Sequence, residues 1–246
     1  MKTVYNATHA LHRAVHEFFR GEKVPAFEKP ERADWVLAAI ERERMGDVIA
    51  PSSHDDGVIL KVHSERYVRF LRGAHAEYTA LGGIGDAFPS VWPIRGMRAD
   101  VEPTSFAARM GLYSFDAGSP LTSGTWLAAR AGADCALTGA ALLSAGEASA
   151  FVLTRPPGHH AGRDFFGGYC FLNNAAIAAQ ALRDAGCARV AILDVDYHHG
   201  NGTQDIFYER GDVFFASVHG DPRTEYPFYL GHADERGVGA GEGEAG

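Results

Sequence analysis

Short apolar runs alternate with longer amphipathic stretches over the C-terminal half of this chain. Short apolar runs of this kind are typical of buried strands. Three such runs predict strands, over 150–154, 189–195 and 212–218. Helical spacing of apolar residues predicts three helices, over 124–145, 173–185 and 203–210. This alternation indicates an α/β fold around a parallel sheet, and ligands are then expected outside the carboxyl ends of the strands.

The N-terminal half is less regular. Residues 31–45 carry apolar groups on one helical face and charges on the other, which predicts an amphipathic helix. Ser64 is placed as the N-cap of a second helix, which continues through Tyr67 and Phe70. In residues 73–123, Gly and Pro recur among scattered aromatics with little periodicity. This stretch predicts an ordered functional loop or an interface segment.

Composition narrows the class of protein. A chain of 246 residues with 46% apolar content can bury one large core, which favours a single α/β domain. The net charge of -8 argues against sequence-independent nucleic-acid binding. Three scattered cysteines make neither a disulfide framework nor a cysteine-based zinc site. No apolar run reaches the roughly 18 residues of a membrane span and no secretory h-region follows Met1, so we expect a soluble cytoplasmic protein.

Candidate catalytic and metal-binding residues follow two of the predicted strands. The segment DVDYHHGNG begins at the end of the 189–195 run. Side chains at alternate positions of an extended segment share one face, which would group Asp194, Asp196 and His198. A carboxylate with a neutral imidazole suits zinc. Spacing alone leaves open which two of the three bind metal, and the third could instead orient a neighbouring histidine.

A tandem histidine pair follows the 150–154 run. His159 and His160 lie in RPPGHH, where two prolines stiffen the loop. A histidine beside a metal-activated water can take its proton and return it to a leaving amine. His219, at the end of the 212–218 run, is a secondary candidate. Cys170 is interpreted as a small packed hydrophobe, because no feature predicts an activated thiolate.

These residues also carry a family resemblance. The segments RPPGHHA, GGYCFLNNAA and ILDVDYHHGNGTQ resemble the zinc-dependent deacetylases, which include histone deacetylases and acetylpolyamine amidohydrolases. The stretch HGDPRTEYPFYLGHADE resembles the acetylpolyamine branch most closely. The resemblance is most specific over 150–232. It implies an arginase-like three-layer α/β sandwich around a mostly parallel sheet, built as one domain over 1–246.

The resemblance implies roles for the motif residues. Zn²⁺ would be bound by Asp196 and His198, while His160 would be the general base and acid and His159 its electrostatic partner. Asp194 would support His159 and also join Ser217 in a monovalent-cation site for K⁺.

The resemblance extends to the walls of the site. Asn201 stands where many histone deacetylases carry Asp. Gly168 and Tyr169 match one wall of a substrate tunnel, and Tyr226 matches an aromatic on the opposite side.

The resemblance also implies a third zinc ligand, an Asp, and a carbonyl-polarising Tyr downstream of residue 246. We therefore expect a C-terminally truncated form in which the last part of the sheet is missing. Such a form would be poorly stable and nearly inactive, because two ligands make a weak zinc site and an unpaired buried strand exposes an edge.

Residues 82–120 are expected to be a loop insertion that shapes the site and a homodimer interface. In the polyamine branch, acidic residues of this loop meet a distal ammonium group. The register here puts Ala107 and Gly118 at those positions, with Asp116 as the nearest carboxylate. Desolvating an ammonium without a partner is costly, so the preference for charged polyamines would be weaker.

The implied reaction is the removal of acetyl groups from acetylated polyamines or similar small N-acetyl alkylamines, giving acetate and the free amine. Two alternatives stay open. One is a protein acetyl-lysine deacetylase with the same chemistry on a larger substrate, and the other is a non-catalytic amine-binding descendant. An arginase-like two-manganese hydrolase is disfavoured, because the motif offers too few carboxylates for two metals.

Overall fold

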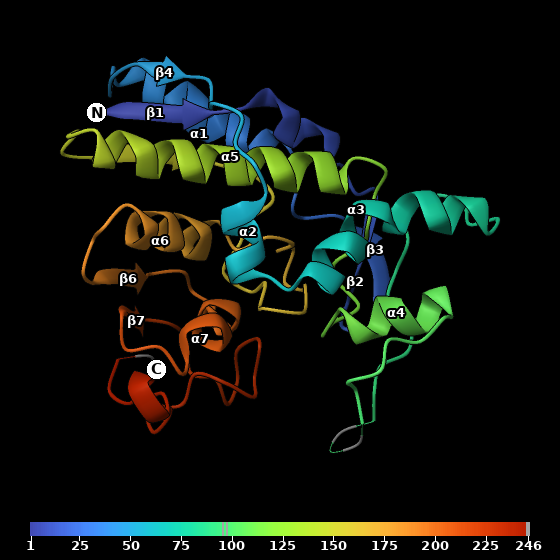
Figure 1. Ribbon diagram of the computed structural model, residues 1–246. Coiled ribbons are helices and arrows are strands. Elements are labelled where there is room, and N and C mark those ends of the chain that lie inside the picture. Colours follow the sequence, from blue (N-terminus) through green and yellow to red (C-terminus); the bar gives the residue numbers. More distant parts are fainter. Residues whose placement is uncertain (95, 97, 245–246) are drawn as a thin grey trace.

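The computed structural model describes residues 1–94, 96 and 98–244, and it has helices packed around parallel strands (Figure 1). The first sheet has β1 (Lys2–Tyr5) in its centre, between β4 (Val48–Ile49) and β5 (Ala150–Leu153), and both neighbours run parallel to it. The apolar run that predicts the strand at 150–154 thus forms β5, one residue shorter than expected.

Helices cover both faces of this sheet. Leu153 packs with Ala33 and Ile40 of α1 (Glu31–Arg42). The preceding residue, Val152, points to the opposite face, where α5 (Thr125–Ser144) crosses the sheet. Gly139 of α5 faces Val152 so closely that a Cβ would touch its methyl group. The predicted helices over 31–45 and 124–145 are therefore confirmed, with ends that differ by a few residues.

The second parallel ladder joins β6 (Val190–Asp194) to β7 (Val213–Ser217). Among the described residues no ladder joins β5 to β6, so the strands at 150–154 and 189–195 are not neighbours in one continuous sheet. The sequence pattern identifies each strand but does not specify its neighbour, because a helical crossover can place the next strand more than one position away. The connecting helix, α6 (Asn174–Asp184), packs against α5 and β6.

Local signals explain where several helices begin and end. The side chain of Asn173 accepts a hydrogen bond from the amide of Ala176 and caps α6. Gly186, with φ of +100°, follows its last turn. Ser64 caps α3 (Glu65–Ala80) in the same way, through the amide of Tyr67. The N-cap predicted at Ser64 is therefore confirmed.

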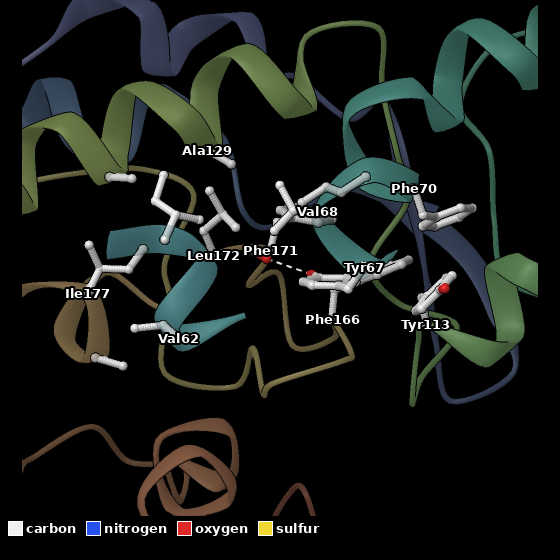
Figure 2. Packing of buried hydrophobic residues seen from close by; sticks show 14 of the residues in the cluster. Val62, Tyr67, Val68, Phe70, Tyr113, Ala129, Phe166, Phe171, Leu172 and Ile177 are labelled. Atoms are coloured by element: carbon white, nitrogen blue, oxygen red, sulfur yellow. Dashed lines mark hydrogen bonds between the residues drawn. The ribbon is translucent and has the colours of Figure 1, made fainter. Parts of the chain in front are cut away.

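The main core lies where α2 (Gly57–Val62), α3, α5 and α6 meet the loop before α6 (Figure 2). The hydroxyl of the buried Tyr67 donates to the carbonyl of Phe171 at 2.5 Å. Phe70 stacks on Tyr113, which follows the short helix α4 (Phe106–Leu112). This aromatic packing ties the 106–121 region to the body of the molecule.

The remaining elements are short. An antiparallel hairpin joins β2 (His16–Phe19) to β3 (Glu22–Pro25), and α7 (Asn201–Phe207) connects β6 to β7. Two 3₁₀ turns cover Ala7–Leu11 and Gly239–Gly241. In the described part of the chain, no helix is both long and apolar enough to cross a membrane.

Candidate active site

The candidate site lies beyond the carboxyl ends of β5 and β6, where their following loops meet. The loop after β5 is anchored at its second residue: the buried guanidinium of Arg155 donates to Glu28 and to the backbone carbonyls of His9 and His12. Four residues later the same loop presents His159 and His160.

Each histidine of the pair is held through Nδ1 by a side-chain oxygen atom, one from the last residue of β6 and one from the first residue of α7. Nδ1 of His159 donates to Oδ2 of Asp194 at 2.9 Å. Nδ1 of His160 lies 2.7 Å from Oδ1 of Asn201. Because the amide oxygen of Asn201 only accepts, the proton of neutral His160 belongs on Nδ1. Its Nε2 is then left with a lone pair that can accept a proton.

The electrostatic environment keeps His160 neutral. Burial lowers the pKa of His160 to about 3, and the neighbouring His159 imidazole acts in the same direction. Burial by itself would raise the pKa of Asp194, but the hydrogen bond and charge of His159, together with the amide of Asp196, outweigh it and leave that pKa below its ordinary value. A neutral imidazole beside an imidazole that is paired with a carboxylate is suited to proton transfer.

Asp196 and His198 lie next to this pair. The chain bends after Asp194, whose Oδ1 accepts from the amide of Asp196, so the extended geometry assumed for 194–198 ends at the strand terminus. The two side chains still converge, with Oδ1 of Asp196 and Nδ1 of His198 3.3 Å apart. Two ligands at about 2.0–2.1 Å from a tetrahedral zinc ion would be separated by roughly 3.3 Å.

The donor pair therefore fits a divalent metal in spacing and in chemistry. Both side chains are about half exposed, at 52% and 43%, so both atoms can reach an ion from solvent. Among the described residues, no group of three or more His, Cys, Asp or Glu side chains converges to hold a metal.

Two segments enclose His160. The ring of Tyr226 meets the His160 ring edge-on, with centroids 5.1 Å apart, and lies 5.8 Å from the His198 ring. Gly168, with φ of +52°, sits so close to His160 that a Cβ at this position would overlap the imidazole. Phe115 stacks against Tyr226 with centroids 5.9 Å apart. Gly168 and Tyr226 thus both pack against the imidazole.

Two carboxylates that hold these walls were not assigned that role from the sequence. Asp116 accepts from the Tyr226 hydroxyl at 2.6 Å and from the Gly168 amide at 2.7 Å. Glu17, on β2, accepts from the hydroxyl of Tyr169 at 2.6 Å. Periodicity could not reveal these contacts, because both join segments more than 50 residues apart.

The other expected residues lie as follows. Asp194 and Ser217 are register partners at the ends of β6 and β7. The hydroxyl of Ser217 is 2.7 Å from Nδ1 of His219, whose Nε2 donates to the carbonyl of Gly231. His219 therefore connects the end of β7 to a later loop, and its ring packs near that of His199. Cys170 is fully buried, as expected of a packed hydrophobe.

The 82–120 segment is described except for residues 95 and 97. Ala107 is exposed in the first turn of α4. Gly118 lies two residues after Asp116 and donates its amide to Oδ1 of that carboxylate.

Residues 26–245 match the family model of the histone deacetylase domain, and the chain belongs to that family. It is an enzyme of the metal-dependent, hydrolytic deacetylase class. Among its relatives, acetylpolyamine amidohydrolases 1 and 2 of Pseudomonas aeruginosa are 55% and 54% identical, over 99% of this chain and 70% of theirs. The crystal structure of acetylpolyamine aminohydrolase from Burkholderia pseudomallei superposes with a TM-score of 0.91 at 41% identity, over 99% of this chain and 70% of that one. The α/β deacetylase-like fold and the family expected from the motifs are thus confirmed.

Proposed function

We propose that this protein is a zinc-dependent amidohydrolase that removes acetyl groups from acetylated polyamines or similar small N-acetyl alkylamines. The observation that carries the proposal is the tandem pair His159 and His160, each held through Nδ1, beside the converging donors of Asp196 and His198. The names of the relatives, which are acetylpolyamine amidohydrolases, support the choice of substrate class.

The residues of the chain divide the work as follows. Asp196 and His198 would hold the zinc ion, which when bound supplies a Lewis acid that polarises the acetyl carbonyl and a water molecule. His160, kept neutral by burial, accepts a proton from the attacking water at Nε2 as the water oxygen bonds to the acetyl carbon. It then returns the proton to the departing amine nitrogen, which leaves as the free amine while acetate remains.

His159 and Asn201 support this transfer in different ways. The carbonyl of Asn201 fixes the tautomer of His160 and can stabilise the imidazolium when it forms. His159 shares its Nδ1 proton with Asp194, so positive charge on that imidazole is balanced by a carboxylate. Two imidazoles with centroids 4.0 Å apart would otherwise repel each other when either is protonated.

The walls favour a narrow substrate. Tyr226, Phe115 and the Gly168 backbone lie around the ring of His160, and this residue is only 3% exposed, so a thin alkyl chain fits better than a folded polypeptide. We also propose that Asp194 and Ser217 bind a structural K⁺ ion, and that the 82–120 segment contributes to a homodimer.

The test compares turnover of a small acetylated amine with turnover of an acetylated peptide by this protein. We expect turnover of acetylputrescine to exceed that of an acetyl-lysine peptide by at least about 100-fold in kcat/KM, because a narrow site excludes the peptide. His160→Ala should abolish turnover of both substrates while the protein stays folded.

The two alternative functions predict different results in this assay. Equal or faster turnover of the peptide would identify a protein acetyl-lysine deacetylase. Binding of acetylputrescine without any acetate release by the wild-type protein would identify a non-catalytic amine binder.

A further inference from the structure

One carboxylate joins three backbone and side-chain donors at the mouth of the site. Oδ2 of Asp116 accepts from both the Gly168 amide, at 2.7 Å, and the Tyr226 hydroxyl, at 2.6 Å. Oδ1 of the same residue accepts from the Gly118 amide at 3.0 Å. These donors come from segments that lie 2, 52 and 110 residues away in sequence. A carboxylate offers about four lone-pair directions, so three of the directions of Asp116 are already used within the protein.

Both distant donors of Asp116 belong to groups that contact the catalytic imidazole. Gly168 lies against the ring of His160 with no room for a Cβ. Tyr226 presents its ring to His160 at an interplanar angle of 87°. The backbone at Gly168 and at Tyr169 has a positive φ, and the Gly168 amide donates out of this turn to Oδ2 of Asp116. A single oxygen atom therefore accepts from both groups that contact the His160 ring.

We infer that Asp116 is a positioning residue that sets the width of the site by holding Gly168 and Tyr226 against His160. It acts through its shared acceptor oxygen and not by attracting a distal ammonium group of the substrate. This inference rests on the proposed hydrolysis of small acetylated amines. It differs from the expectation drawn from the 82–120 loop, in which Asp116 is the nearest carboxylate for a charged substrate.

Two substitutions separate the two roles. Asp116→Asn removes the charge but keeps one carbonyl oxygen, which can accept from both Gly168 and Tyr226, while only the Gly118 bond is lost. Asp116→Ala removes the acceptor as well. We expect Asp116→Asn to keep kcat/KM for acetylputrescine within about threefold of wild type, because the two bonds that hold Gly168 and Tyr226 keep their acceptor. Asp116→Ala should lose about 10- to 100-fold, mostly in kcat, because the enclosure of His160 relaxes.

A pair of substrates reads out the charge directly. The ratio of kcat/KM for cationic acetylputrescine to that for neutral N-butylacetamide should be unchanged in Asp116→Asn. A tenfold or greater fall in this ratio would overturn the inference in favour of ammonium recognition. Activity of Asp116→Asn as low as that of Asp116→Ala would overturn it as well.

Two further variants guard against a merely structural effect. Asp55→Ala removes the same kind of bond, from the Gly57 amide to an aspartate two residues earlier, at a site remote from His160, and should leave activity unchanged.

Tyr226→Phe removes only one of the bonds to Asp116 and should cost less activity than Asp116→Ala. Adding Tyr226→Phe to Asp116→Ala should cost little more, because the two residues share one interaction. Fully additive losses in the double variant would contradict the shared role.

A readout without catalysis distinguishes this inference from the proposed function. In protein labelled with ¹⁵N-glycine, the Gly168 amide should exchange slowly with deuterium in wild type and in Asp116→Asn, and faster in Asp116→Ala. If the wild type hydrolyses no acetylated amine, the proposed function fails, yet this exchange pattern still tests the acceptor. Equal exchange in all three proteins would overturn the positioning role.

Discussion

The guanidinium of Arg155 and the carboxylate of Glu28 form a two-bonded ion pair in which both side chains are more than nine-tenths buried. Nε donates to Oε1 at 2.5 Å and Nη2 donates to Oε2 at 2.7 Å. The same guanidinium donates to the carbonyls of His9 and His12, so it joins the N-terminal segment to the loop that carries His159 and His160. The position of the tandem histidines thus depends on an anchor outside the site.

Arg155→Met should lower the free energy of unfolding by about 3–5 kcal/mol, because it leaves a buried carboxylate and two carbonyls without their donor. Chemical denaturation at pH 7 measures this loss. Arg13→Met is the matched control, because Arg13 forms an exposed pair with Glu31 and its removal should cause no measurable change. Equal effects of the two substitutions would show that the buried pair is not an anchor.

Stability should fall in mild acid because of His63. Its Nδ1 donates to the Gly162 carbonyl at 2.8 Å and its Nε2 accepts from the Asn173 amide at 2.9 Å, so the native state holds it neutral. Burial lowers the pKa of His63 from its ordinary value of 6.5 to about 4. Between these values the unfolded chain binds a proton and the native chain does not. The contribution is therefore fully favourable above pH 6.5 and declines as the pH falls toward 4, by about 3 kcal/mol in total.

Urea unfolding at pH 7.5, 6.5, 5.5 and 4.5 measures this slope. His63→Gln keeps an acceptor for the Asn173 amide and does not titrate, so its stability should depend less on pH. Burial also lowers the pKa of His12 to about 3, so some slope should remain in the variant. An unchanged slope in His63→Gln would refute the assignment.

Gly168→Ala should reduce kcat by at least about 100-fold, because its Cβ would displace the ring of His160. Gly146→Ala is the control for backbone strain, since Gly146 also has a positive φ, of +100°, but has open space at its Cβ position. The melting temperature should fall in both variants, and further in Gly168→Ala because its Cβ overlaps His160. Only Gly168→Ala should lose activity in steady-state kinetics. Loss of activity in both would point to a general effect of strain.

The elements that the sequence predicts well are those with long apolar patterns. α5 and α6 and the strands β5, β6 and β7 all appear within a few residues of their predicted ranges, because burial on one or both faces leaves a clear period in the sequence. The hairpin of β2 and β3 is not among these predictions. Its strands are short and its turn has Arg20 and Gly21 in place of the usual Asn-Gly signal.

The site shows the same division between local and long-range information. The pair of His159 with Asp194 is implied by the family resemblance of the two motifs, whereas the pair of His160 with Asn201 is a contact that the sequence did not specify. The sequence predicts that this helix begins at residue 203, but α7 begins at Asn201. Asn201 therefore lies in the first helical turn, where its side chain reaches His160. The contacts of Asp116 and Glu17 with Tyr226 and Tyr169 depend on loops whose course no periodicity specifies.

The last prediction separates residues that bind metal from residues that move protons. His198→Ala should lose both the zinc ion and activity, because it removes one of two converging donors, whereas His159→Ala should keep zinc and lose most of its activity. Zinc content is measured by atomic absorption after dialysis, and activity by acetate release from acetylputrescine. Dipicolinic acid should abolish wild-type activity, and added Zn²⁺ should restore it to wild type but not to His198→Ala. Retention of a full equivalent of zinc by His198→Ala would exclude this residue as a ligand. Loss of zinc from His159→Ala would mean that His159 binds the ion, contrary to its assigned electrostatic role.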